Sequence, residues 1–527
     1  MAKTVFYILL ALGFLLVAAM DKGLSVYPWI AGIYALYAIV GLYDLFLARH
    51  NVLRNYPVIG HLRYAFEFIS PEIRQYFIET NESGRPYNRI TRELVYARAE
   101  GKDDSQPFGT QYDILDAGYA RANHSLAPKE VDAKEARVEI GGPYCAQPYN
   151  ASRLNISAMS FGALSPNALL ALNAGARRGG FAHNTGEGGL SPYHLREGGD
   201  IIWQIGTGYF GCRSAGGAFD PDAFKQKAAH ASVKMVEIKL SQGAKPSHGG
   251  VLPAAKVNRE IAKVRGVPVG EDVLSPPAHS AFSTPVGLME FVVRLRDLSG
   301  GKPVGFKLCV GDWREFMGIV KAMLEMKVTP DFITVDGAEG GTGAAPVEYS
   351  NRFGAPANEG VLFVHNVLVG AGLRDEIKII SSGKVATGFD MVEKMALGAD
   401  ACNAARAMMF ALGCIQALSC NTNACPTGIA TQDRSRMKAV NVAQKKVHVA
   451  TYHERTMKSL LDMVGAMGYD SPDQLTPGDI FRRIGDETER SFAQLYATLA
   501  PGSLRETADA PREYADAWEM ASAKRFR

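Results

Sequence analysis

Between residues 154 and 430, short apolar runs alternate with segments of helical periodicity, and this alternation constrains the fold more than any other feature of the chain. The runs that have the length of strands lie at residues 154–162, 233–243, 302–311, 331–341, 378–388 and 399–409. Helical patterns follow most of them, as "WREFMGIVKAMLEM" follows the run at 302–311. Strands that alternate with helices in this way pair in parallel.

We therefore expect an α/β chain built on a (β/α)8 barrel of the TIM type, because residues 154–430 match the usual length of one such barrel. A doubly wound open sheet is the alternative, since it uses the same alternation. Residues 51–153 are polar and irregular, which predicts a cap or linker region before the barrel. Residues 431–527 have helical periodicity and many charges, which predicts a helical C-terminal extension.

The first fifty residues contain two apolar runs without a charged residue, Thr4–Met20 and Val26–Tyr43. A bilayer span needs about 20 apolar residues, with roughly 17 as the lower limit, so both runs are long enough. Tyr and Trp near their ends suit the membrane interface. We expect a transmembrane helical hairpin at residues 1–50. A cleaved signal peptide is the alternative for the first run, which has a basic start and a small-residue end.

Basic residues indicate the orientation of this hairpin. One basic residue, Lys3, precedes the first run, and three follow the second run, Arg49, Arg54 and Arg63. The loop between the runs holds only Lys22, which Asp21 offsets. The positive-inside rule then places both ends and the body of the protein in the cytoplasm, on the inner or cytoplasmic membrane. In that reducing compartment, clustered cysteines are more often ligands or catalysts than disulfides.

The overall charge argues against one class of partner. The formal net charge is +3, and no long basic run is present. We therefore expect no nucleic-acid partner.

Two glycine turns near the end of the predicted barrel are candidates for an anion site. "SSGKVATG" (Ser381–Gly388) and "NAARAM" (Asn403–Met408) follow the last two strands, where such barrels often bind phosphate. Gly383 lets backbone N–H groups approach an anion, while Lys384 and Arg406 supply charge. Ordinary turns with surface Lys and Arg are the alternative.

Lys307 stands inside the apolar run "VGFKLCV". An unpaired buried ammonium is costly, so this lysine predicts a site that faces the barrel mouth. There it could stabilise a reduced flavin or a substrate carboxylate. A lysine at the end of a strand whose head reaches water is the alternative. By contrast, "GTGYFG" (Gly206–Gly211) matches a nucleotide-binding pattern only formally; no long helix follows it directly, and a tight turn is the better interpretation.

Three cysteines lie within twelve residues, with the spacing C-x5-C-x4-C, at Cys414, Cys420 and Cys425. Zinc sites usually pair cysteines more closely and use four ligands, and no histidine is near. Three thiolates on an irregular loop suit an iron–sulfur cluster with three cysteine-bound irons. Small buried cysteines without a metal are the alternative.

Several motifs together resemble the synthase domain of glutamate synthases. They are "SAMSFGALSP", "NTGEGG", "QGAKPSHGG", "EGGTGAAP" and "GCIQALSCNTNACPTGIATQ". More narrowly, the chain resembles the short, membrane-anchored FMN-binding glutamate synthase family proteins, from about residue 51 to 510. The resemblance implies an FMN-bearing barrel and a [3Fe–4S] cluster held by the three cysteines. It also implies the reductive formation of L-glutamate from 2-oxoglutarate and ammonia through an imine.

The resemblance implies roles for individual residues. Met159 and Ser160 are expected beside the isoalloxazine ring, and Gln242 and Lys307 at its pyrimidine edge. The phosphate is expected on the turns already described, at Gly383, Lys384 and Arg406. Lys245 in "GAKP" is a candidate ligand of the substrate carboxylates, with a surface lysine as the alternative.

The chain departs from the pattern of full-length glutamate synthases in two places. Met1-Ala2-Lys3 leads directly into the first apolar run, where those enzymes begin with a glutaminase cysteine. We therefore expect ammonia from solution or from an ammonia-supplying subunit. His248 stands where many members have an acidic residue; it could relay a proton or bind a different substrate, or be a plain loop histidine.

These expectations combine into an FMN and iron–sulfur oxidoreductase of glutamate biosynthesis. Electrons are expected from a ferredoxin, a flavoprotein subunit or a membrane carrier, because no pyridine-nucleotide domain is evident. One alternative is a same-fold enzyme that acts on another amine or 2-oxo acid, for example to form an N-alkylglutamate. Another is a membrane-anchored scaffold or electron-transfer subunit.

Overall fold

The computed structural model describes residues 2–20, 28–506 and 510–527, and the predicted hairpin loop with Asp21 and Lys22 lies outside them. The chain forms two compact units, Met1–Arg85 and Pro86–Arg527. The predicted region 51–153 therefore contributes to both units.

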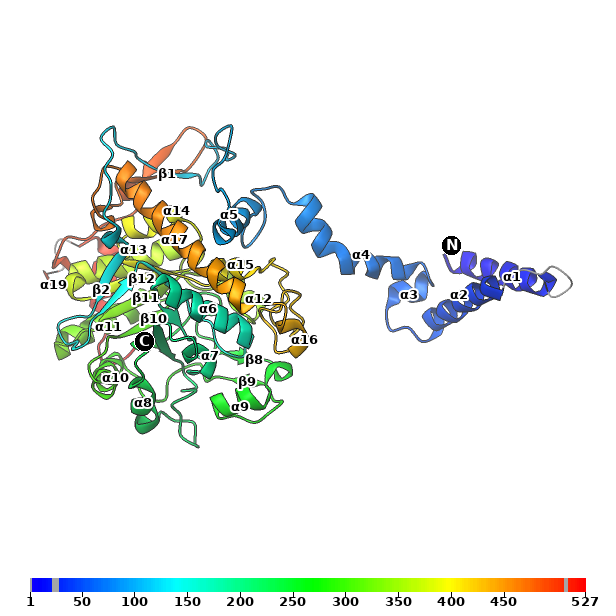
Figure 1. Ribbon diagram of the computed structural model, residues 1–527, viewed down its shortest axis with the longest axis horizontal. Helices are drawn as coiled ribbons and strands as arrows, with labels where there is room; N and C mark the ends of the chain where they lie inside the picture. The colour runs from blue at the N-terminus through cyan, green and yellow to red at the C-terminus, as the bar shows by residue number, and fades with distance from the viewer. Residues whose placement is uncertain (1, 21–27, 507–509) are drawn as a thin grey trace. The chain divides into compact units, whose positions relative to one another are not determined.

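Eight parallel strands of the larger unit close into a barrel (Figure 1). In order around the barrel they are β10 (Val304–Leu308), β11 (Phe332–Asp336), β12 (Lys378–Ser382), β13 (Ala401–Ala404), β4 (Leu154–Ile156), β5 (His183–Asn184), β6 (Ile201–Ile205) and β7 (Val233–Lys239). The first and last of these strands in the chain close the ring, with Cys402 opposite Leu154. The predicted (β/α)8 barrel is confirmed, and the open sheet is excluded.

Helices follow most of the barrel strands. They are α6 (Pro166–Gly179), α7 (Pro192–Leu195), α8 (Pro221–Ala228), α9 (Arg259–Arg265), α10 (Pro285–Leu298), α11 (Trp313–Met326), α12 (Val347–Arg352), α13 (Ala357–Ala371), α14 (Gly388–Ala396) and α15 (Arg406–Leu412). Local sequence sets their ends. The Ser165 side chain accepts a hydrogen bond from the backbone N–H of Ala168 at the start of α6, and Gly180 ends it with φ +69°.

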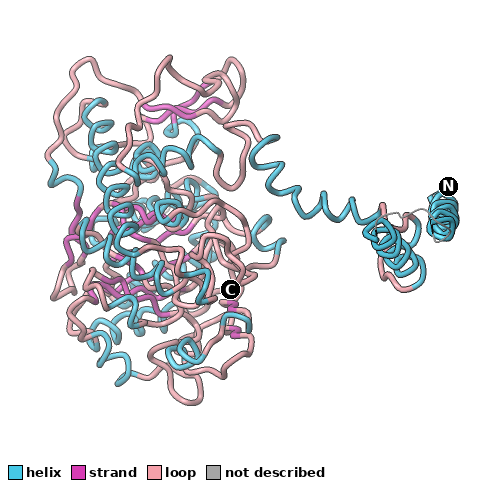
Figure 2. Tube along the Cα trace, turned by 45° about the vertical axis from the view of Figure 1, so that its right-hand side comes forward, coloured by secondary structure: helices cyan, strands magenta, loops and turns pink. Residues whose placement is uncertain are grey.

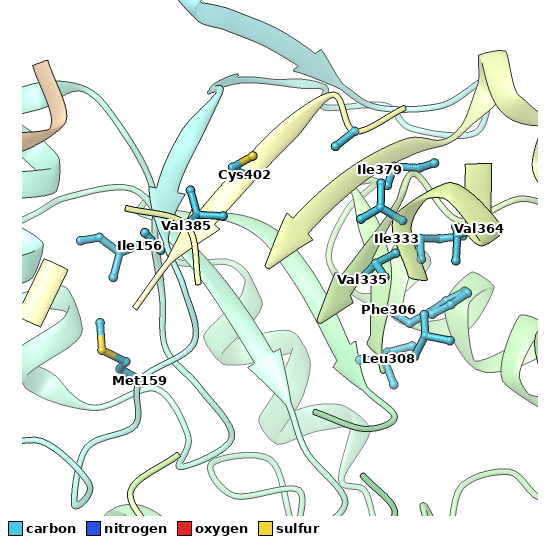
Figure 3. Close-up of a cluster of buried hydrophobic side chains, with 14 of the residues drawn as sticks. Ile156, Met159, Phe306, Leu308, Ile333, Val335, Val364, Ile379, Val385 and Cys402 are labelled. Carbon is cyan, nitrogen blue, oxygen red and sulfur yellow. The ribbon is translucent and has the colours of Figure 1, made fainter. Parts of the chain in front are cut away.

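The core lies between the strands and the surrounding helices. Its side chains alternate along the strands, so that Phe306 of β10 and Ile333 and Val335 of β11 are buried against the helical layer. Figure 3 shows Val364 of α13 beside the two β11 residues. "GTGYFG" follows β6 and forms turns, and α8 begins only at Pro221, which confirms the turn interpretation.

The C-terminal region packs onto the barrel as helices and a small sheet. Its helices are α16 (Arg434–Met437), α17 (Val442–Ala466), α18 (Phe492–Leu495), α19 (Ser503–Glu506) and α20 (Arg512–Met520). The long helix α17 lies against α6, α14, α15 and α5 (Arg89–Glu100). Strand β14 (Ile480–Arg483) pairs with β1 (Ala120–Ala122) on one side and with β15 (Glu489–Ser491) on the other, in a small sheet at the edge of the unit (Figure 2). Two further hairpins pair β2 (Arg137–Ile140) with β3 (Tyr149–Ser152) and β8 (Val251–Leu252) with β9 (Val273–Leu274).

The smaller unit contains α1 (Ala2–Met20), α2 (Pro28–Phe46), α3 (Asn51–Asn55), α4 (Gly60–Ile73) and a π-helical turn, Arg74–Ile78. The first two helices lie side by side: the Tyr34 hydroxyl donates to the Leu10 carbonyl at 2.7 Å, and the rings of Phe6 and Tyr37 are 5.4 Å apart. By length and composition, Pro28–Phe46 can cross a membrane, and Ala2–Ala18 is a shorter apolar helix.

Candidate active site

A cavity of about 280 Å³ opens at the C-terminal ends of the barrel strands, where barrels of this type carry their sites. Residues at and after several strand ends line it, among them Met159 and Ser160 after β4, Glu187 after β5, Gln204 of β6, Lys239, Gln242 and Lys245 at and after β7, and Arg406 after β13. Cys414, Cys420 and Cys425 line the same cavity. The structure thus brings eight of the predicted site residues to one place.

A buried ion pair forms one wall of this cavity. The Lys239 ammonium lies 2.9 Å from a carboxylate oxygen of Glu187, and 7% and 18% of the two side chains are exposed. Burial raises the pKa of Glu187, but Lys239, Lys245 and Arg265 outweigh it and hold the pKa below its usual value. Burial lowers the pKa of Lys239, with Glu187 opposing. The site therefore holds one carboxylate among several cations.

Lys245 and Gln242 present polar groups to the same space. The Lys245 ammonium donates to the Ala344 carbonyl at 2.8 Å, and burial lowers its pKa to about 8 although Glu187 opposes this. The Gln242 Nε2 atom is buried and has no hydrogen-bond partner among the described residues. A buried donor without a partner is costly, so this amide indicates a ligand that the cavity accommodates.

The two glycine turns meet at a tyrosine ring. The guanidinium of Arg406 lies 4.9 Å from the centre of the Tyr87 ring, and the Lys384 ammonium lies 6.0 Å from it. Gly383 has φ +120°, and a Cβ there would lie 3.1 Å from the backbone nitrogen of Gly337. Burial raises the pKa of Tyr87 to about 12, so the ring stays neutral beside the two cations. Gly383 and Lys384 do not themselves line the cavity.

Lys307 belongs to β10 in the wall of the barrel and does not line the cavity. Its side chain is 5% exposed, and its ammonium is 3.8 Å from a carboxylate oxygen of Asp336. The same carboxylate accepts from the backbone N–H of Gly243, the residue after Gln242, at 3.0 Å. Lys307 is thus buried and paired, and it supports the loop that carries Gln242.

His248 lies on the loop after β7 but does not line the cavity. Its Nδ1 atom is 2.8 Å from the carbonyl oxygen of the next residue, Gly249, and its ring contacts that of Tyr349 edge to face at 5.2 Å. Its predicted role in proton transfer or substrate choice stays a prediction.

The cysteine loop follows α15 and is fixed at several points. The Tyr96 hydroxyl donates to the Cys414 carbonyl at 2.6 Å. Gln416 exchanges two hydrogen bonds with the backbone of Tyr87, at 3.1 and 3.0 Å. The Lys256 ammonium donates to the Cys420 carbonyl at 2.7 Å. The loop is therefore held in one conformation by groups from distant parts of the chain.

The three thiols differ in their surroundings. Burial raises the pKa of Cys420 and raises that of Cys414 to about 11. Burial also raises the pKa of Cys425, but the Thr427 hydroxyl and backbone N–H groups of the following turn outweigh it and lower the pKa. The Cys425 sulfur lies 3.4 Å from that hydroxyl.

This donor set fits an iron–sulfur cluster better than a single ion. Within the described parts of the chain, no three Cys, His, Asp or Glu side chains converge to hold one metal ion. In a cluster each cysteine binds a different iron, so the thiols need only line a common space, as these three do. Backbone N–H groups of the following turn also face the Cys425 sulfur, and hydrogen bonds to the sulfurs are among the features that tune such clusters.

Sequence reasoning missed several residues of the site. Lys239 ends the apolar run "VKMVEIK" and carries the same signal that identified Lys307. Glu187 stands within "NTGEGG", and a single acidic residue among glycines could have identified it as a candidate. Tyr87 and Lys256 gave no local signal, because their roles depend on contacts with residues far along the chain.

Comparisons with known proteins identify the family of the chain. The conserved region in glutamate synthase matches residues 105–470. The glutamate synthase large subunit-like protein YerD of Bacillus subtilis is 38% identical over 492 residues, which cover 86% of this chain and 93% of that protein.

Two other relatives match over smaller shares. The archaeal-type glutamate synthase [NADPH] of Thermotoga neapolitana is 35% identical over 59% of this chain and 58% of its own length. The ferredoxin-dependent glutamate synthase 2 of Synechocystis is 35% identical over 51% of this chain and 16% of its own length. The chain belongs to the glutamate synthase family and is an oxidoreductase of that family.

Proposed function

We propose that this chain binds FMN and a [3Fe–4S] cluster and reduces the imine of 2-oxoglutarate and ammonia to L-glutamate. The observation that carries the proposal is the shared cavity, in which strand-end cations and Gln242 lie with three cysteines. When bound, FMN would supply the two electrons that the imine carbon accepts, and the cluster would pass electrons to it one at a time.

The protein's own residues would bind and orient the reactants. Arg406, with Lys384 across the Tyr87 ring, supplies charge for the phosphate, and the unpaired Gln242 amide can donate to the isoalloxazine edge. Lys245, which lines the same cavity, would bind a substrate carboxylate. A proton must reach the imine nitrogen, and the Lys239 ammonium can give one and take another from solvent, while the Glu187 carboxylate beside it favours the charged form of the lysine.

Anaerobic purification followed by flavin, iron and sulfide analysis tests the cofactors, and a turnover screen tests the reaction. With reduced donor and 2-oxoglutarate, we expect glutamate from ammonia and no product from glutamine. Product from methylamine alone would favour N-alkylglutamate formation instead. A flavin that reduces without any turnover would favour an electron-transfer subunit.

Replacing Arg406 by alanine should weaken FMN binding. A hydrogen bond to a charged group contributes about 1.5–3 kcal/mol, so the Kd for FMN should rise roughly ten- to a hundredfold. Flavin fluorescence titration of the apoprotein measures it. Arg178→Ala, on the exposed end of α6, is the control. An unchanged Kd for Arg406→Ala would remove this residue from the phosphate site.

Carboxylate binding by Lys245 should depend on pH. Its pKa is lowered to about 8, so the charged form predominates below pH 8 and is lost above it. With free ammonia held constant, kcat/KM for the 2-oxo acid should fall about tenfold from pH 7 to pH 9, mainly through KM. Lys245→Arg, which stays charged, should flatten this profile. A wild-type KM that stays constant over the same range would contradict the assignment.

We also propose that the N-terminal unit anchors the protein in the cytoplasmic membrane with the barrel in the cytoplasm. Exposed apolar side chains on α1 and α2 support this, for example Leu16, Leu36 and Ile39. The full chain should resist alkaline washing of membranes, and a variant without residues 1–50 should be recovered in the soluble fraction. A full chain released by washing would refute the anchor.

The electrons would come from a ferredoxin, a flavoprotein subunit or a membrane carrier. The ammonia would come from solution or from another subunit.

A further inference from the structure

Lys256 is a buried lysine directly behind the cysteine loop. Its side chain belongs to a short 3₁₀ turn, Ala254–Lys256, and the residue is 3% exposed. Its ammonium donates three hydrogen bonds to carbonyl oxygens, those of Cys420 at 2.7 Å, Ala430 at 2.9 Å and Ala163 at 3.2 Å. No carboxylate of the described residues lies within ion-pair distance of it, so its charge has no carboxylate partner in the part of the chain that the structure describes.

The three carbonyl groups belong to two separate segments that line the cavity. Cys420 and Ala430 bracket Cys425, and Ala163 follows the turn that carries Met159 and Ser160. All three residues line the cavity, whereas Lys256 does not. The lysine thus joins the turn after β4 to the cysteine loop and places a positive charge just outside the space that the thiols share.

A buried ammonium without an acid is costly unless a negative charge lies near it. Three thiolates on a neighbouring loop would supply that charge. A fixed positive charge beside an iron–sulfur centre stabilises its reduced, more negative form, and hydrogen bonds that fix the ligand loop hold its shape.

We propose that Lys256 is a positioning residue that acts through the cysteine loop and raises the reduction potential of the iron–sulfur centre. This inference rests on the proposed cluster. Lys256 would have two separable effects. Its hydrogen bonds would hold the cysteine loop and so retain iron, and its positive charge would raise the reduction potential.

Two substitutions separate these effects. Lys256→Gln keeps a donor but removes the charge, and Lys256→Arg keeps the charge. Lys302 offers a matched control: it is also buried, and its ammonium donates to the carbonyls of Ala228 and His230, outside the cavity. Lys302→Gln therefore removes a comparable charge at a distance from the cysteines.

The experiment is an anaerobic redox titration of the intact protein, followed by electron paramagnetic resonance, with iron and labile sulfide measured per chain. In Lys256→Gln we expect the one-electron reduction constant of the cluster to fall about tenfold, or about 59 mV. Lys256→Arg and Lys302→Gln should keep the wild-type potential. Loss of iron from Lys256→Gln, but not from Lys302→Gln, would also support the positioning role.

Two results would overturn the inference. One is a wild-type potential with full iron in Lys256→Gln; the other is equal loss of iron or equal shift of potential in Lys302→Gln. A wild-type protein that contains no iron or labile sulfide after anaerobic purification would instead refute the proposed cluster itself.

Discussion

Replacing Cys420 by serine is expected to remove nearly all iron and labile sulfide from the purified protein while the barrel stays folded. A thiolate is the ligand that iron–sulfur clusters require, and a serine hydroxyl is a poor substitute for it. Cys420 is only partly buried, so the exchange of sulfur for oxygen costs little packing. Iron and sulfide per chain, measured with far-ultraviolet circular dichroism, test the prediction.

Cys145 provides the matched control. It is also partly buried, but its sulfur contacts the Gly301 carbonyl at 3.4 Å, and it does not line the cavity. Cys145→Ser should keep its full iron content. Full iron in Cys420→Ser would disprove the ligand assignment, whatever the activity of that variant.

Replacing Glu187 by alanine should lower the free energy of unfolding by about 3–5 kcal/mol, because it leaves the buried Lys239 ammonium without its partner. Lys245 and Arg265 add like charge around the same point. The missing carboxylate should also lower the pKa of Lys245 further, since Glu187 raises it. Urea denaturation monitored by fluorescence measures the loss, and turnover at pH 7 should fall with it.

An exposed ion pair gives the scale for comparison. Lys458 and Asp462 lie 2.6 Å apart on the surface of α17, with 74% and 61% of their side chains exposed. Asp462→Ala should therefore cost less than about 1 kcal/mol. For Glu187→Gln, which keeps an acceptor oxygen, the loss of unfolding free energy should lie between those of Glu187→Ala and Asp462→Ala. A cost for Glu187→Ala no greater than that for Asp462→Ala would show that the buried pair contributes little.

The fold could be predicted where strands are long and apolar. The runs that became β7, β10, β11 and β12 are continuous and almost wholly buried, which gives parallel strands a strong signal. β5 has only two residues, His183 and Asn184, and its place in the ring is set by pairing with β4 and β6. β6 lies between glycine-rich segments, which conceal it as part of a turn.

The candidate site could be predicted only where a local pattern in the sequence marks a residue. Arg406 and the cysteines were identifiable because chemistry-bearing residues stand beside a glycine turn or share a spacing, whereas Lys245 was named through the family resemblance. The contacts that complete the site join residues far apart in sequence, such as Tyr87 with Gln416 and Lys256 with Cys420. No local pattern encodes these pairs, because tertiary packing creates them. Lys307 is the opposite case. The sequence marked it clearly, as a lysine inside an apolar run, and the structure pairs its ammonium with Asp336.

The long helix α17 has a consequence for how such a barrel can be inherited. It covers α6 so closely that Gly175 faces Val449 without room for a side chain, and the Tyr452 hydroxyl donates to the Ala386 carbonyl beside α14. A recombination event that transferred only residues 154–430 to another gene would leave these apolar surfaces bare. Barrel and tail should therefore descend together as one evolutionary block.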